Sequence, residues 1–151
     1  MAVITRTVTI ESPVENVFDV VAHVDSFSAA VPAIDKVEFL SEQRRGVGTR
    51  FRETREVNGR TGTTTLEVTE YVENERVRIV SDAGGTIWDT LFTTRSNDEG
   101  TDLTMVMEAR PHTLLARIST PMIKGMVAKG IEADLVAVKA HCEGSAGGSD
   151  N

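Results

Sequence analysis

Between residues 34 and 110, short runs of alternating hydrophobic and polar residues are separated by turn residues. A period of two residues is typical of strands that bury one face. The pair Asn58-Gly59, after the run Arg50–Val57, is a strong signal for a two-residue hairpin. Links this short cannot supply the long crossovers that parallel pairing needs. This part of the chain therefore predicts six antiparallel strands.

Residues 3–10 also alternate and predict one more strand, which makes about seven in all. Two short helices are expected to follow it. Ser12 is the expected N-cap of the first helix, with Glu15 closing a capping box. Asp25 is the expected N-cap of the second helix, which should stop at Pro32.

Residues 113–142 have no strand pattern and show the amphipathic spacing of a helix about 45 Å long. Pro121 predicts a kink or break in this helix. The Gly-, Ser- and Asp-rich residues 143–151 predict a disordered tail. The order of elements predicts one α+β domain over residues 3–142, in which a seven-stranded antiparallel sheet wraps around the C-terminal helix. A ligand would then sit between the sheet and the helix.

Charge and composition argue against some classes of binding partner. The formal net charge is -7, which disfavours binding to nucleic acid and to anionic membrane surfaces. The N-terminal residues do not resemble a signal peptide, and no apolar run approaches the length needed for membrane insertion. A single cysteine, Cys142, excludes an intramolecular disulfide. These features indicate a soluble cytoplasmic protein, and they leave open whether it is a monomer or a homodimer.

One predicted strand carries charge on a face that should be buried. Phe51, Glu53, Arg55 and Val57 share that face. One interpretation is a polar anchor inside the cavity, with Glu53 as a general base and Arg55 polarising a carbonyl group. The alternatives are an ordinary ion pair at a half-wet rim and a face that is exposed.

Further candidates for ligand binding are apolar or aromatic: Phe51, Tyr71, Trp88, Phe92, Met105, Met107, Met122 and Met126. Four methionines that converge on one space would suit an adaptable pocket, and Tyr71 could act as a general acid. The alternative interpretation of these residues is ordinary packing, which the common structural use of Trp and Tyr favours for Trp88 and Tyr71. The histidines show no HxH or HExxH spacing and no Cys/His cluster accompanies them. The sequence therefore predicts neither a metal site nor a cofactor.

Several segments together resemble a known superfamily. They are "VTIESPVENVFDVVAHVDSFSAAVP", "VGTRFRETREVNGR", "LEVTEYVENERVRIV" and the amphipathic C-terminal helix. The chain is similar to helix-grip proteins: START-like lipid-transfer domains, Bet v 1-type proteins and the polyketide cyclase/dehydrase (SRPBCC) group. The resemblance implies the helix-grip fold and a hydrophobic cavity for a small apolar or aromatic molecule.

Three functions are compatible with these features. The first is a carrier or sensor that binds a small hydrophobic, aromatic or lipid molecule. The second is a polyketide cyclase or dehydratase that uses Glu53. The third is a protein-interaction or assembly factor, which an exposed apolar patch would mark, and the sequence shows no such patch clearly.

Overall fold

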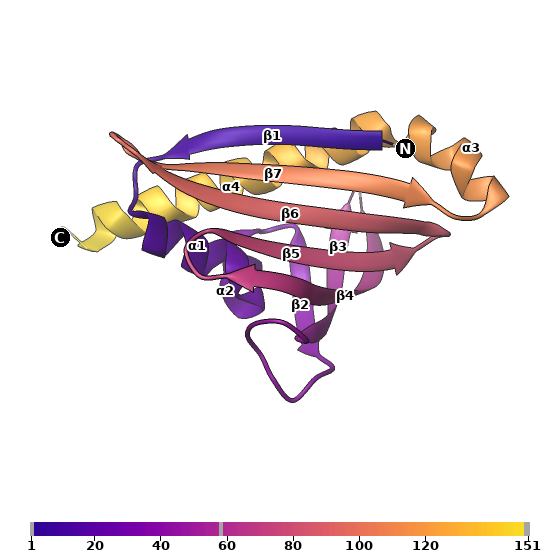
Figure 1. Ribbon diagram of the computed structural model, residues 1–151, viewed down its shortest axis with the longest axis horizontal. Coiled ribbons are helices and arrows are strands. Elements are labelled where there is room, and N and C mark those ends of the chain that lie inside the picture. Colours follow the sequence, from indigo (N-terminus) through magenta and orange to yellow (C-terminus); the bar gives the residue numbers. More distant parts are fainter. Residues whose placement is uncertain (1, 58, 150–151) are drawn as a thin grey trace.

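The computed structural model describes residues 2–57 and 59–149, with the backbone alone at residues 57 and 145–149. The strands are β1 (Ala2–Ile10), β2 (Ile34–Phe39), β3 (Arg50–Val57), β4 (Arg60–Val72), β5 (Arg76–Ala83), β6 (Thr86–Asn97) and β7 (Gly100–Pro111). Within the described residues they form one antiparallel sheet in the order β1-β7-β6-β5-β4-β3-β2 (Figure 1). The predicted seven-stranded sheet is confirmed.

The hairpin between β3 and β4 has the predicted length, because Val57 pairs with Arg60. Asn58 itself lies outside the described residues. Gly59 has a φ of +77°, a conformation that favours glycine. Local turn chemistry therefore sets the register of this hairpin.

The helices are α1 (Val14–Ala22), α2 (Val24–Ala30), α3 (Leu114–Met122) and α4 (Lys124–Ser149). The two short helices after β1 are confirmed. The break predicted at Pro121 is also confirmed, because α3 ends one residue later and α4 begins at Lys124. The backbone of α4 continues past residue 142, and residues 150–151 lie outside the described residues. Disorder of the tail stays a prediction.

The predicted starts of the two short helices are wrong in detail. Pro13 precedes α1 and no side chain caps that helix. Ser12 is buried and its carbonyl accepts the Thr101 hydroxyl at 2.8 Å, which ties the helix start to β7. His23, not Asp25, precedes α2. Asp25 lies in the first turn of α2, where its negative charge interacts favourably with the helix dipole.

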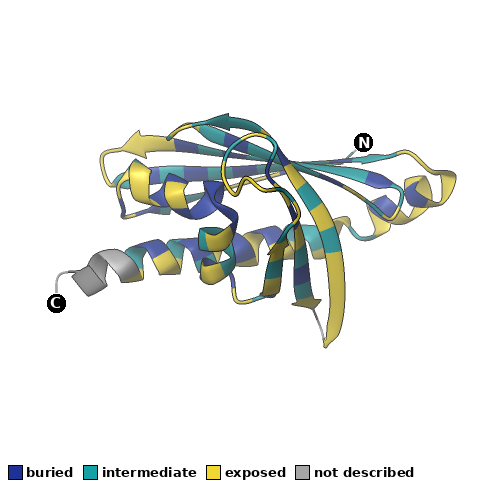
Figure 2. Cartoon of the chain, turned by 90° about the horizontal axis from the view of Figure 1, so that it is seen from below, coloured by how far each residue is buried: buried dark blue, intermediate teal, exposed yellow. Residues whose placement is uncertain are grey.

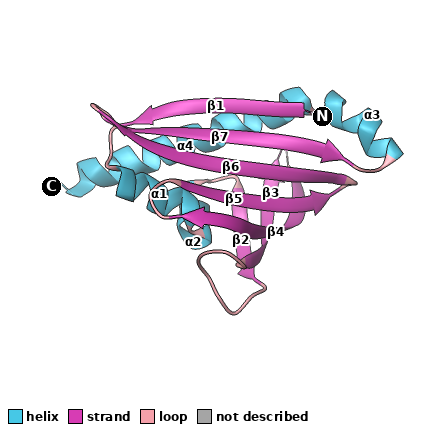
Figure 3. Cartoon of the chain, viewed as in Figure 1, coloured by secondary structure: helices cyan, strands magenta, loops and turns pink. Residues whose placement is uncertain are grey.

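α4 lies along one face of the curved sheet, while α1 and α2 close one end (Figures 1 and 3). The side chains that α4 buries are Ile131, Asp134, Leu135, Val138 and Cys142. Their spacing of three and four residues places them on one face of the helix, and Figure 2 shows buried and exposed residues alternating along it. One member of this buried face is a charged residue.

Candidate functional site

The charged face of β3 points at α4. Phe51 on that face is buried, and Arg55 lies on the same face four residues further along the strand. Arg55 Nε donates to Glu53 Oε1 at 2.6 Å. Its two terminal nitrogens donate to Asp134 Oδ1 and Oδ2 of α4, each at 3.0 Å. The pair that the sequence places on one strand is therefore a cluster of three charges between sheet and helix.

The three charged side chains of this cluster are largely buried, so they interact strongly with one another. The side chains of Arg55, Glu53 and Asp134 are 28%, 13% and 8% exposed. Burial alone would lower the pKa of the Arg55 guanidinium, but the hydrogen bonds and charge of Asp134, and then those of Glu53, outweigh it. The pKa of Arg55 is therefore held above its usual value. Every nitrogen of the guanidinium donates to a carboxylate, and Arg55 thereby links β3 to α4 through Asp134.

Glu53 also borders an open surface pocket of about 300 Å³. The register of β3 and β4 places Gly62 opposite Arg55, and the missing side chain leaves room there. The lining residues are Glu53, Arg55, Arg60, Thr61, Gly62 and Thr64. A carboxylate at the edge of a pocket can accept a proton from a bound molecule.

A second space lies between the sheet and the N-terminal part of α4. Its volume is about 10 Å³, which is room for about one water molecule. It is lined by Ala2, Ile4, Trp88, Met107, Ala109, Thr120, Lys124 and Val127. Trp88 is held in place by its Nε1, which donates to the Ala83 carbonyl at 3.3 Å. The apolar space expected between sheet and helix is thus present but nearly filled by side chains.

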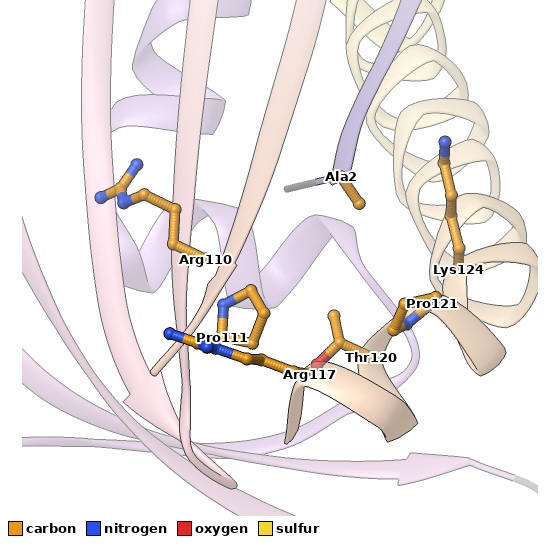
Figure 4. A pocket seen from close by; sticks show the side chains of 7 residues that line it. All are labelled: Ala2, Arg110, Pro111, Arg117, Thr120, Pro121 and Lys124. Atoms are coloured by element: carbon orange, nitrogen blue, oxygen red, sulfur yellow. The ribbon is translucent and has the colours of Figure 1, made fainter. Parts of the chain in front are cut away.

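A third, larger space opens to solvent at the junction of α3 and α4 (Figure 4). Its volume is about 490 Å³, and its lining residues are Ala2, Arg110, Pro111, Arg117, Thr120, Pro121 and Lys124. It shares Ala2, Thr120 and Lys124 with the small apolar space. The two spaces therefore adjoin, with the open one outside and the apolar one inside.

The open space has a cationic lining. The Arg110 guanidinium is already paired with two carboxylates, because it donates to Glu108 at 2.6 Å and to Asp89 at 3.2 Å. For Arg117 and Lys124, no described carboxylate lies within ion-pair distance. These two side chains can therefore receive an anionic or polar group of a ligand.

Tyr71 lies away from these spaces, close to α1. Its ring packs edge-on against Phe18 at a centroid distance of 5.4 Å. Its hydroxyl lies 3.3 Å from His23 Nε2. Burial, followed by the charge of Glu73, raises the pKa of Tyr71, so the hydroxyl stays protonated at neutral pH.

The remaining predicted lining residues divide between interior and surface. Phe51, Phe92 and Met105 are buried in the core. Met122 and Met126 are 79% and 56% exposed. The expectation that four methionines converge on one space is therefore wrong, because Met122 and Met126 are exposed on either side of the break between α3 and α4.

Sequence reasoning missed Asp134, although a signal exists. Ile131, Leu135, Val138 and Cys142 mark the buried stripe of the helix, and Asp134 falls within it. A lone acid on a buried helix face is a natural partner for an unexplained cation on a facing strand. Arg117, Thr120 and Lys124 were also missed, because nothing local indicates that they border a space.

Two further findings concern the described part of the chain. It contains no group of three or more His, Cys, Asp or Glu side chains placed to hold a metal ion. Among the helices described, none has the length and apolar character to cross a bilayer.

A seven-stranded antiparallel sheet that holds a long C-terminal helix, with two short helices after the first strand, defines the Bet v 1-like helix-grip class. Within this class, the chain belongs to the family described as polyketide cyclase/dehydrase and lipid transport, whose profile matches residues 1–143.

Solved structures support the fold. TTHA0849 from Thermus thermophilus is 14% identical with a TM-score of 0.78, and the match covers 95% of this chain and 99% of that one. The Zhui aromatase/cyclase from Streptomyces sp. R1128 is 20% identical with a TM-score of 0.75, over 94% and 93% of the two chains. Ara h 8.0201 is 14% identical with a TM-score of 0.69, over 93% and 97%. None of the curated proteins matches the chain.

Proposed function

We propose that the protein binds a small apolar or aromatic molecule between the sheet and α4, as a carrier or sensor. The observation that carries this proposal is the pair of adjoining spaces beside α3 and α4. The inner one is lined by Trp88 and Met107, and the outer one by the available cations Arg117 and Lys124. A ligand that fits both has an apolar body and an anionic or polar end. The lipid-transport part of the family description agrees with such a ligand.

The inner space must enlarge for binding. Its volume of about 10 Å³ is far below the several hundred Å³ of a typical ligand pocket. Met107 can move aside because its side chain is unbranched and flexible. α3 is held over the space by a buried hydrogen bond of 2.9 Å between the hydroxyls of Thr86 and Thr120. Displacement of α3 would break that bond and join the two spaces.

The test starts with native mass spectrometry of gently purified protein and identification of any retained molecule. A panel of fatty acids, their methyl esters, isoprenoids and aromatic polyketides is then tested by thermal shift and by quenching of Trp88, the single tryptophan. We expect a free fatty acid to bind more tightly than its methyl ester, because Arg117 and Lys124 favour a carboxylate. No retained molecule and no shift across the panel would count against the proposal.

A matched pair of variants locates the site. Met107→Trp fills the inner space and should abolish binding, as seen by mass spectrometry and thermal shift. Met126→Trp changes an exposed methionine of α4 and should leave binding intact. Equal effects of the two variants would place the ligand elsewhere.

We propose as the second function acid–base catalysis on a polyketide-like substrate at the open pocket beside Glu53. Its support is the Glu53 carboxylate at the pocket edge, where only one oxygen accepts from Arg55. Glu53→Gln should then abolish turnover with little change in substrate affinity. Glu56→Gln, on the opposite face of the same strand, is the control. Unchanged turnover in Glu53→Gln would exclude this role.

A further inference from the structure

An exposed apolar surface covers α3 and the first turn of α4. Its members, named here the α3 face, are Leu114 (77% exposed), Leu115 (76%), Ile118 (63%), Met122 (79%) and Met126 (56%). Single exposed apolar residues are ordinary, but a contiguous group on one end of a molecule marks an interaction surface. The expectation that the chain has no clear apolar patch is therefore wrong.

The position of α3 explains why this face stays outside. The opposite side of the helix buries Ala116 and Thr120, and Thr113 accepts the Ala116 amide at 3.1 Å as its N-cap. α3 is thus fixed at the end of the sheet, and Figures 1 and 2 show it projecting there with an exposed outer side. The apolar side chains on this outer side are therefore exposed to solvent.

The charge around the α3 face differs from that of the rest of the chain. Residues 111–131 contain three Lys and Arg residues and no Asp or Glu. The other residues contain 13 Lys and Arg against 23 Asp and Glu. Arg117, Lys124 and Lys129 are exposed. The protein is therefore polarised, with one cationic apolar end on an acidic body.

We propose that the α3 face docks on the surface of an anionic lipid bilayer. A helix with apolar residues on one side and cations beside them is suited to lie in the interface plane. The acidic body is repelled by the same surface, which selects an orientation with the α3 face towards the lipid. The whole-chain charge of -7 hides this local reversal.

Other occupants fit the surface less well. A second copy docked by two-fold symmetry would bring Arg117 and Lys124 of both copies together, and like charges repel. A folded protein partner would need a groove shaped to the projecting side chains, whereas a bilayer accepts them without a fixed shape. The docking stands apart from the ligand proposal, because it is measured on protein without added ligand.

The test is flotation of the purified protein with phosphatidylcholine vesicles, with and without phosphatidylglycerol. We expect binding to the anionic vesicles that weakens as salt is raised. Ile118→Glu should reduce the partition constant at least about tenfold, because it removes apolar contact and adds a repelled charge. Val136→Glu is the matched control, since Val136 is 64% exposed on α4 outside the α3 face, and it should bind as the original chain does.

A second pair of variants tests the charge. Lys129→Ala should lower the partition constant about fivefold, whereas Lys36→Ala on β2 should change it little. Circular dichroism confirms that each variant is folded. No binding of the original chain to anionic vesicles, or equal losses in Ile118→Glu and Val136→Glu, would overturn the proposal. Dimerisation that Ile118→Glu abolishes, without vesicle binding, would overturn it in favour of a second copy.

Discussion

Asp134→Asn tests whether the buried ion cluster holds α4 on the sheet. The substitution keeps the shape of the side chain but removes its charge. Asn can still accept one hydrogen bond from Arg55, but its NH₂ group then faces guanidinium N–H donors. Arg55 is left with Glu53 as its remaining charged partner.

The size of the effect follows from burial. Removing one partner of a fully buried ion pair costs about 3–5 kcal/mol. Arg55 is 28% exposed and keeps Glu53, so solvent and the second carboxylate offset part of the loss. We therefore expect the free energy of unfolding to fall by about 2 kcal/mol. The melting temperature should fall by about 4–8 °C.

Urea unfolding followed by Trp88 emission and by circular dichroism measures this change. Glu132→Gln is the control, because Glu132 of α4 also pairs with the sheet through Arg6, but both side chains are about half exposed. It should cost less than about 0.5 kcal/mol. Arg55→Met should cost more than Asp134→Asn, because it leaves two carboxylates unpaired. If Asp134→Asn costs no more than Glu132→Gln, the cluster does not hold the helix.

Two further predictions concern single positions. Gly100 has a φ of +149°, and a Cβ there would collide with the Ile10 carbonyl oxygen, so Gly100→Ala should lower the free energy of unfolding by about 3 kcal/mol. Gly84→Ala, at a φ of +63° with open space around it, should cost about 1 kcal/mol in the same urea assay, and equal costs would refute the steric argument. Burial, followed by the charge of Glu143, raises the pKa of Cys142 from 9.0 to about 11, so the folded thiol should react with thiol reagents far more slowly than the unfolded one. Because the unfolded chain releases this proton first, stability should fall between about pH 9 and about pH 11. The free energy of unfolding of Cys142→Ala should fall by about 2 kcal/mol less over this pH range than that of the original chain. Equal falls in the two proteins would contradict the raised pKa.

The fold could be predicted because its signals are local and repeated. Alternation along each strand and the Asn58-Gly59 turn specify antiparallel neighbours. Pro121 specifies where the C-terminal helix breaks. The errors lie at the starts of α1 and α2, where tertiary contacts override capping signals. Ser12 fits the pattern of an N-cap, but it is buried against β7, where its carbonyl accepts a hydrogen bond from Thr101.

The site could be predicted only in part, because it depends on contacts between distant segments. The two-residue period of the strand places Glu53 and Arg55 on one face, but their partner Asp134 lies 79 residues beyond Arg55. No local pattern joins those positions. Met122 and Met126 fail for a related reason, because the helix breaks between them at Ile123, so their spacing of four residues no longer places them on the buried face of one helix.

The charges on the buried face of β3 are therefore explained by the ion cluster that joins this strand to α4. α4 is fixed near its middle by Asp134 and by Lys139, and the Lys139 ammonium donates to the Thr9 carbonyl at 2.7 Å. Its N-terminal end is separated from α3 by the break after Pro121, and α3 is held by the Thr86–Thr120 hydrogen bond. Local opening is easiest where few such contacts must be broken. The end of the helix beside Trp88, and not the cluster at Arg55, is consequently where the ligand of the proposed function would enter between the sheet and the helix.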